Sequence, residues 1–448
     1  MTQKNKLKHK LKNRHLQMIA LGGVIGTGLF FGSAKSIHLT GPSIVLSYIL
    51  CGIVMFIIMR ALGEMSVYKP NSGSFSEYAH EYIGPYAGFI AGWNAWFEYT
   101  IVCMTELTAV GFFLDYWIPG VPHWETCLVL LMFFTTVNLI SVRFFGEFEF
   151  YFAGIKIIAI VLMLAFSAYI IFFKHGLNPD INLYKDPSYL FAGGIKGFAI
   201  SLVIVVFSFG GTEFVSIAAG EAENPKKNIP LAINGVIIRI LLFYVLTMLA
   251  IVCLYPFEKL ATNVSPFVDV FQKIGIPVAA QVMNVVAITA ALSAFNSCLY
   301  SSSRMLYNLS LHGNSGANLA KTNKAGIPYQ AILWTSFAIL IAVVINYIFP
   351  EKALMYLLTI ATGAILITWF IILISQLRFR NIHKSISKQL DFKLRLFPYS
   401  SIFAILMLFI VMIVMTQMDE MKLSAYITPF WILLLTVLYV LRKKTLNK

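Results

Sequence analysis

The chain has 448 residues, of which 58% are hydrophobic and only 12% are charged, and its formal net charge is +14. A soluble domain typically carries about 25% charged residues, so this composition excludes a large soluble enzyme and is typical of a helical membrane protein. The polar loops are too short for an ATPase domain and no G-x-x-x-x-G-K-[ST] motif occurs, which argues against a pump that hydrolyses ATP.

Apolar segments of about 20 residues, long enough to cross a bilayer, recur along the whole chain. Twelve are expected, and the first is interpreted as a retained helix, not a cleaved signal peptide, because eleven more follow. Their centres lie near Ile25, Val54, Val102, Leu130, Ile160, Val205, Val245, Ala287, Ile339, Ile365, Leu408 and Leu434. The sequence therefore predicts an all-α membrane protein with twelve transmembrane helices.

The predicted spans divide the chain into two five-helix units with short flanking parts. We expect a basic N-terminal tail at 1–15, a first unit at 16–175, a second at 190–378, helices 11 and 12 at 398–441, and a C-terminal tail at 442–448. Because five is an odd number, the second unit enters the membrane from the opposite side. The two units are therefore expected to be inverted repeats.

The positive charge is distributed unevenly between the two sides of the membrane. Most of the 34 Lys and Arg residues fall in the N-terminal tail and in every second loop. We therefore expect a multi-pass protein of the cell (inner) membrane with both termini in the cytoplasm. The opening stretch "KNKLKHKLKNR" is interpreted as a topology signal that contacts anionic lipid, and no nucleic acid partner is expected. The five cysteines form no CxxC pair and no His/Asp/Glu cluster has metal spacing, so neither a metal nor a cofactor is expected. The sequence does not indicate an oligomeric state.

Glycines interrupt the first span, in "LGGVIGTGLFFGSA" at residues 21–34. Glycine inside a helix costs about 1 kcal/mol relative to alanine, so four close together need a reason. Close helix packing through small residues is one candidate. However, the sixth span carries a similar stretch, "FSFGGTEF" at 207–214, in the corresponding position of the second unit. Paired interrupted helices of this kind point to a transporter's binding site, which favours broken helices over simple packing.

A broken helix offers a defined binding chemistry. Lipid excludes unpaired peptide groups, but a protein-lined cavity permits them. The N–H groups at the start of a half-helix suit a carboxylate, and the carbonyls at the end of the preceding half suit an ammonium. We therefore expect an amino acid to bind between the first and sixth spans.

The chain resembles the bacterial amino acid permeases of the amino acid–polyamine–organocation superfamily over essentially its whole length, and most of all the proline-specific branch. The resemblance rests on the motifs "RHLQMIALGGVIGTGLFFGSA", "GPSIVLSYILCG", "RALGEMSVYKP", "GSFSEYA", "TELTAVG", "FGEFEFYFAGIKI", "FSFGGTEFVSIAAGEAENPKKNIP" and "NSCLYSSSRMLY". It implies a LeuT-like fold of two inverted five-helix repeats, with discontinuous helices 1 and 6, followed by two C-terminal helices.

The same resemblance implies how this chain holds its substrate. Peptide N–H groups at 26–28, together with the Thr27 hydroxyl, would bind the carboxylate of an amino acid. Carbonyls of both interrupted spans would bind its ammonium, and Phe207 and Phe209 would close over the site as lids. The predicted substrate-binding residues are Val24, Ile25, Gly26, Thr27, Gly28, Phe207, Ser208, Phe209 and Gly210.

One lysine, Lys156, lies inside the predicted fifth span. Ionisable residues at membrane depth are costly and therefore functional candidates, although a lysine that snorkels at a helix end is the plainer alternative. The resemblance implies that its ammonium takes the place of a sodium ion found in sodium-coupled relatives. We expect Lys156 to couple transport to protons and to bridge the backbone near Gly22 or Gly23 to hydroxyls such as Ser293.

Several glutamates fall near the same depth. Glu213 directly follows the break in the sixth span and is the better candidate for a proton relay or a substrate contact. Glu106 is expected to hydrogen-bond within the bundle as a neutral acid, and Glu98 is a weaker candidate. Glu221, in "GEAENP", would cap its helix and latch the inner gate.

These observations predict a secondary transporter, not an enzyme, that imports an amino acid with protons by alternating access. An exchanger without net proton movement is an alternative, and a nutrient sensor that binds without transporting is disfavoured because no signalling domain is visible. The substrate is expected to be neutral, such as proline or a larger hydrophobic amino acid. Histidine, aromatic or cationic amino acids are the alternatives. Outside the site, Arg60 and Glu64 are spaced to form an i,i+4 ion pair.

Overall fold

The computed structural model describes residues 23–71, 73–140, 142–173, 187–219, 225–261, 264–385, 390–418 and 421–446. All regular secondary structure within these ranges is helical. Nine helical stretches among the described residues are long and apolar enough to cross a membrane, and two shorter apolar helices cover Gly194–Ser208 and Leu241–Leu254. The predicted all-α membrane class is confirmed, while the count of twelve spans and the repeat boundaries stay predictions.

The α-helices, in chain order, are α2 (Ser33–Thr40), α3 (Ile44–Tyr68), α4 (Ser74–Tyr82), α5 (Pro85–Leu114), α6 (His123–Ile140), α7 (Val142–Phe173), α8 (Gly194–Ser208), α9 (Phe214–Ala219), α10 (Pro225–Leu254), α11 (Pro266–Lys273), α12 (Pro277–Leu311), α13 (Tyr329–Ile348), α14 (Ala353–Ile382), α16 (Tyr399–Thr416) and α17 (Lys422–Leu446). A five-residue π-helix, η2 (Gly28–Gly32), precedes α2, and short 3-10 turns are η3 (Gly41–Ser43), η4 (Pro187–Phe191), η5 (Phe257–Lys259) and η6 (Ala317–Ala320).

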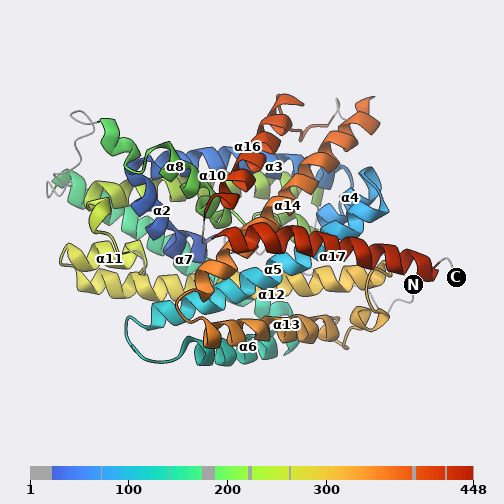
Figure 1. The fold of residues 1–448 in the computed structure, drawn as a ribbon, viewed down its shortest axis with the longest axis horizontal. Coiled ribbons are helices and arrows are strands. Elements are labelled where there is room, and N and C mark those ends of the chain that lie inside the picture. The colour runs from blue at the N-terminus through green and yellow to red at the C-terminus, as the bar shows by residue number, and fades with distance from the viewer. Residues whose placement is uncertain are drawn as a thin grey trace.

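Helix α5 forms the centre of the bundle. It packs against α12, α14 and α4, and most of its side chains are buried. Figure 1 shows α5 and α12 side by side, with α6 and α13 along one outer edge. The outer helices carry exposed apolar side chains, for example Val129 on α6 and Phe337 on α13. In water such a surface would be costly, but it suits a surrounding of lipid tails.

The predicted interruption at 207–214 is present in the described residues, and at the first predicted interruption the structure shows a non-helical stretch followed by the start of a helix. The chain from Gly23 to Gly26 forms turns and bends, and helical structure begins only at Thr27 and continues into η2. Helix α8 ends at Ser208, a non-helical turn follows, and α9 begins at Phe214. The glycine pattern of the sequence therefore located two non-helical stretches about 185 residues apart. The residues before Gly23 lie outside the described part of the chain.

Candidate substrate and coupling site

The two interruptions lie against each other, and glycine makes this approach possible. Gly211 has a φ of +91°, a left-handed conformation that residues with a Cβ rarely adopt. A Cβ added there would lie 2.8 Å from the Gly23 carbonyl oxygen, and one added to Gly28 would lie 2.6 Å from Ser208 Cα. Both distances are too short for a side chain. These glycines therefore bring the backbone of one broken helix into contact with that of the other.

A tyrosine on α10 holds the two breaks together. The Tyr244 hydroxyl lies 2.9 Å from the Val24 carbonyl oxygen and 2.8 Å from the Ser208 carbonyl oxygen, and the ring is fully buried. The Ser208 carbonyl stands at the end of α8, and the Val24 carbonyl lies in the non-helical stretch before Thr27, so neither carbonyl is inside a helix. The hydroxyl has one proton, which it shares between the two carbonyl oxygens, and it so connects the stretch at Val24 with the end of α8. The sequence did not suggest this residue.

A glutamate from α5 occupies the start of the half-helix at Thr27. Glu106 accepts hydrogen bonds from Thr27 N, at 3.2 Å, and from Thr27 Oγ1, at 2.5 Å. A Cβ on Gly26 would lie 2.7 Å from Glu106 Oε1, so a larger residue at this position would displace the carboxylate. The helix start thus attracts a carboxyl group, as its free N–H groups and dipole predict. In this structure that group belongs to the protein, not to a ligand.

Lys156 reaches the first break from α7. Its side chain is fully buried, and Nζ donates a hydrogen bond to the Ile25 carbonyl oxygen at 2.9 Å. The contact was expected near Gly22 or Gly23. The observed carbonyl lies two residues beyond Gly23, and Gly22 lies outside the described residues.

The expected hydroxyl, Ser293 on α12, donates to Glu149 Oε1 at 2.7 Å. Glu149 is fully buried on α7 and stands seven residues before Lys156. Seven residues are about two helical turns, so both side chains face the same way. This spacing of seven is visible in the sequence. The buried lysine therefore has an acidic neighbour on its own helix face.

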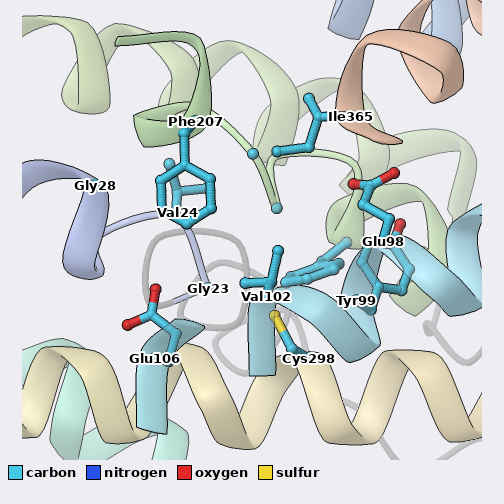
Figure 2. Close-up of a pocket in the computed structure, with 13 residues that line it drawn as sticks. Gly23, Val24, Gly28, Glu98, Tyr99, Val102, Glu106, Phe207, Cys298 and Ile365 are labelled. Atoms are coloured by element: carbon cyan, nitrogen blue, oxygen red, sulfur yellow. The ribbon is translucent and has the colours of Figure 1, made fainter. Parts of the chain in front are cut away.

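The breaks enclose a small cavity, shown in Figure 2. Its volume is about 10 Å³, roughly what one water molecule needs. Glu106 lies at one end, below Gly28, and Glu98 and Tyr99 lie together at the other. The lining residues are Gly23, Val24, Gly28, Glu98, Tyr99, Val102, Glu106, Phe207, Gly210, Gly211, Phe214, Cys298 and Ile365.

The two phenylalanines predicted as lids are placed differently. Phe207 lines the cavity, but Phe209 is not among the lining residues. Phe209 is fully buried and packs against the rings of Tyr48 and Tyr244, with centroids 6.0 Å and 5.2 Å away. The expectation that Phe209 covers the site is therefore wrong in this structure, because its side chain belongs to an aromatic cluster with α3 and α10. Ser208 contributes its carbonyl and a hydroxyl 3.3 Å from Tyr48 Oη.

The ranking of the glutamates also changes. Glu98, the weaker candidate by sequence, lines the cavity. Glu213 is fully buried but is not among the lining residues, and it accepts hydrogen bonds from Gly211 N at 3.2 Å and from Thr212 Oγ1 at 3.4 Å. The structure thus brings both acids to one end of the site. Glu221, the predicted gate latch, lies outside the described residues.

The predicted ion pair between Arg60 and Glu64 does not form. Glu64 is fully buried and pairs with Arg380 of α14, with Oε1 2.6 Å from Nε and Oε2 2.8 Å from Nη2. Arg60 donates instead to Asn234 and to the Lys393 carbonyl. A buried carboxylate gains more from a two-pronged guanidinium contact than from a neighbour one turn away. The hydrogen bonds of Arg60 and Arg380 together connect α3, α10 and α14 with the segment at 390–398.

A larger cavity, of about 450 Å³, lies beside η2 and α2. Phe31 and Gly32 line it from this segment, Ile204 lines it from α8, and Lys35 and Glu351 also line it. This larger cavity begins about one helical turn after Gly28. The Glu64–Arg380 pair lies near the C-terminal ends of α3 and α14, whereas the cavity is lined by Leu354 near the N-terminal end of α14, so the two lie on opposite sides of the breaks.

A bundle of apolar helices around a small buried cavity, made where two non-helical stretches meet, is typical of a membrane transport protein. The sequence profile of the amino acid permease family matches residues 15–447. The chain belongs to the amino acid permease family. It is 41% identical over 442 residues to the aromatic amino acid transport protein AroP of Escherichia coli K12, covering 98% of this chain and 96% of the relative. It is 42% identical, over 98% of this chain and 95% of the relative, to the amino acid permease YtnA of Bacillus subtilis.

These relatives agree with the class that the sequence predicted. The chain is an amino acid permease of the superfamily that its motifs resembled, it is not an enzyme, and it is a multi-pass protein of the bacterial inner membrane. Neither relative is named for proline, so the expected proline branch stays a prediction.

Proposed function

We propose that this permease imports an amino acid together with protons, by alternating access to the cavity between the two broken helices. The observation that carries the proposal is the contact of Lys156 Nζ with the Ile25 carbonyl, at 2.9 Å. It connects the one buried lysine among the described membrane helices to the backbone that would hold the substrate.

The direction of coupling follows from this contact. A protonated Lys156 fixes the Ile25 carbonyl and with it the shape of the first break. Loss of the proton removes the charge from the ammonium, and with it the stronger, charge-assisted form of this hydrogen bond. The proton therefore favours the geometry that binds substrate, and substrate and proton leave together on the side where the proton is lost. Glu149 and Glu106 supply the negative charge that keeps a buried ammonium tolerable.

The main chain of the substrate is proposed to lie along the breaks. Its carboxylate would take the N–H groups at 26–28, which requires Glu106 to move aside or to share Thr27. Its ammonium would take carbonyls at the opposing ends, among them that of Phe207. Glu106 then acts as the group that satisfies the helix start when no substrate is bound.

The side chain of the substrate would enter an apolar space. Val102, Phe207, Phe214 and Ile365 line the cavity, and the Escherichia coli relative is named for aromatic amino acids. We propose a neutral substrate with an apolar or aromatic side chain, and proline belongs in the test panel as the smaller alternative.

Access is proposed to alternate between two faces. The cavity of about 450 Å³ beside α2 would be the outer entrance, and the Glu64–Arg380 pair would close the cytoplasmic side. Both termini would lie in the cytoplasm, and the basic residues 1–15 would contact anionic lipid there.

The test is uptake into proteoliposomes. A pH gradient, acidic outside, should drive accumulation of a labelled amino acid, and a protonophore should abolish it. Uptake that ignores the gradient but requires internal amino acid would favour an exchanger. Competition by all twenty amino acids, with proline and the aromatic residues compared directly, would identify the substrate.

A further inference from the structure

Three buried serines form a chain of hydrogen bonds that joins α9 to α3 and α4. Ser216 Oγ of α9 lies 2.8 Å from Ser66 Oγ of α3 and 2.8 Å from Ser74 Oγ, at the first position of α4. Each of these serines is at most 1% exposed. Ser216 is the one polar residue in α9, whose sequence is FVSIAA. It is therefore the only residue of α9 whose side chain can hydrogen-bond to the neighbouring helices.

The protons of this chain run in one direction. Ser66 Oγ donates to the Leu62 carbonyl oxygen at 2.9 Å. Because a hydroxyl has one proton, Ser66 accepts from Ser216, and Ser216 accepts from Ser74. Hydrogen bonds in such a chain polarise and strengthen one another. Removal of the Ser216 hydroxyl would break both bonds and leave the buried Ser74 hydroxyl without its acceptor.

The backbone of Ser74 is held in an unfavourable conformation. Its φ is +50°, in the left-handed region that residues with a Cβ rarely adopt. Strain of this kind persists only where the surrounding structure maintains it, and it points to a role for the residue at that position. The hydrogen bond from Ser74 to α9 is the role that the contacts indicate.

The serine chain is connected to the substrate cavity through Phe214. Phe214 is the first residue of α9, lines the cavity, and stands two residues before Ser216. Its ring packs against that of Tyr99 on α5, with centroids 4.8 Å apart. Ser66 follows Glu64 by two residues on α3, so the serines lie at the same end of α3 as the Glu64–Arg380 pair. A movement of α9 away from α3 and α4 would therefore withdraw one wall of the cavity on that side.

We infer that Ser74, Ser216 and Ser66 form a latch, which holds α9 against the cavity and opens when the substrate leaves toward the cytoplasm. This inference rests on the proposed function, from which it takes the cytoplasmic side, and it adds Ser216 as a positioning residue of the transport cycle. Hydroxyl groups suit a contact that must break repeatedly. Water that enters as α9 moves away can replace each lost hydrogen bond, so the serines are satisfied in the closed and in the open arrangement.

A cysteine of the protein can report on the latch. Cys298 of α12 lines the cavity, and Figure 2 shows its sulfur directed toward it. The parent protein for the test keeps Cys298 and carries alanine at Cys51, Cys103, Cys127 and Cys253. A membrane-impermeant methanethiosulfonate is added to membrane vesicles of defined orientation, and the rate at which Cys298 reacts is measured from each side. Ser216→Ala should raise the rate from the cytoplasmic side about fivefold or more and should not raise it from the outside.

Ser76→Ala is the matched control. Ser76 lies on α4 two residues after Ser74, and its hydroxyl contacts the Gly73 carbonyl and Met305 Sδ, not α9. This variant should keep the parent's rates on both sides. A second comparison tests whether the serines act together. Ser74→Ala combined with Ser216→Ala should react no faster than Ser216→Ala alone, because both changes remove the same hydrogen bond.

Three outcomes would overturn the inference. They are an unchanged cytoplasmic rate in Ser216→Ala, an equal rise from both sides, which would show a general loosening of the bundle, and effects of the two substitutions that multiply. If Ser216→Ala fails to fold, Ser66→Ala removes the acceptor of Ser216 and should give the same one-sided rise, and its absence would again contradict the latch.

The proposed function is tested separately, by uptake into proteoliposomes of the parent protein. Accumulation driven by a pH gradient without the one-sided rise would leave the proposed function standing and remove the latch. A one-sided rise in a protein whose uptake ignores the gradient would support the latch and contradict proton coupling.

Discussion

The clamp made by Tyr244 gives the sharpest structural prediction. Its hydroxyl lies 2.9 Å from the Val24 carbonyl and 2.8 Å from the Ser208 carbonyl, which belong to the two different broken helices. The substitution Tyr244→Phe removes this hydroxyl and keeps the ring, so packing against Tyr48 and Phe209 is retained. The change therefore isolates the hydrogen bonds that join the breaks.

The size of the effect follows from burial. A buried carbonyl that loses its donor costs about 1–3 kcal/mol, and water has little room to replace the hydroxyl in a cavity of about 10 Å³. Because the breaks form the proposed binding site, most of this cost should fall on the substrate-binding geometry. An energy of 1–3 kcal/mol corresponds to a dissociation constant weakened about 5-fold to 150-fold.

The assay is equilibrium binding of the labelled substrate to purified protein, with thermal unfolding measured in parallel. Tyr48→Phe is the matched control, because its hydroxyl contacts only the Ser208 side chain, at 3.3 Å, and its loss should weaken binding about twofold, or by ~0.5 kcal/mol. Wild-type affinity in Tyr244→Phe, or equal losses in the two variants, would refute the idea that this tyrosine joins the two breaks.

Three further predictions follow from other parts of the molecule. Lys156→Ala should abolish accumulation driven by a pH gradient while substrate exchange across the membrane continues, and undiminished accumulation would remove Lys156 from the coupling. Gly211→Ala should reduce transport at least about tenfold, since a left-handed backbone costs about 1–2 kcal/mol and the new Cβ would meet the Gly23 carbonyl; transport at the wild-type rate would contradict the close approach. His312, just after α12, pairs with Glu77 at 2.8 Å, which raises the pKa of His312 and lowers that of Glu77. A raised histidine pKa stabilises the fold below about pH 6.5, and this stabilisation is lost as the pH rises through the folded-state pKa. His312→Gln should therefore lower the melting temperature more at pH 6 than at pH 9. The difference should be worth less than about 1 kcal/mol, because the ion pair is partly exposed. An equal offset at both pH values would show that the ion pair contributes nothing.

The sequence allowed the backbone features of the site to be predicted well. Glycine is needed where the chain breaks or where backbones meet, so the positions of Gly26, Gly28 and Gly211 mark the interruptions directly. The buried lysine, Lys156, was visible because a charge stands out in an apolar span. These signals are local, and each can be read from a few neighbouring residues.

The contacts between distant side chains could not be predicted in this way. Tyr244 and Val24 are 220 positions apart, and Arg380 and Glu64 are 316 apart. In a membrane helix the face toward lipid and the face toward the bundle are both apolar, so periodicity does not show which way a residue points. This is why Glu98 was ranked below Glu213 and why Phe209 was expected over the cavity. Only the packed helices determine these pairings.

The most direct test of the account is proton movement that accompanies the substrate. Proteoliposomes carrying the wild-type permease and an internal pH dye receive the substrate with no initial gradient. We predict that the interior acidifies as the amino acid enters, and that Lys156→Ala liposomes show no pH change. Entry of the amino acid into wild-type liposomes with a constant internal pH would contradict proton coupling through Lys156.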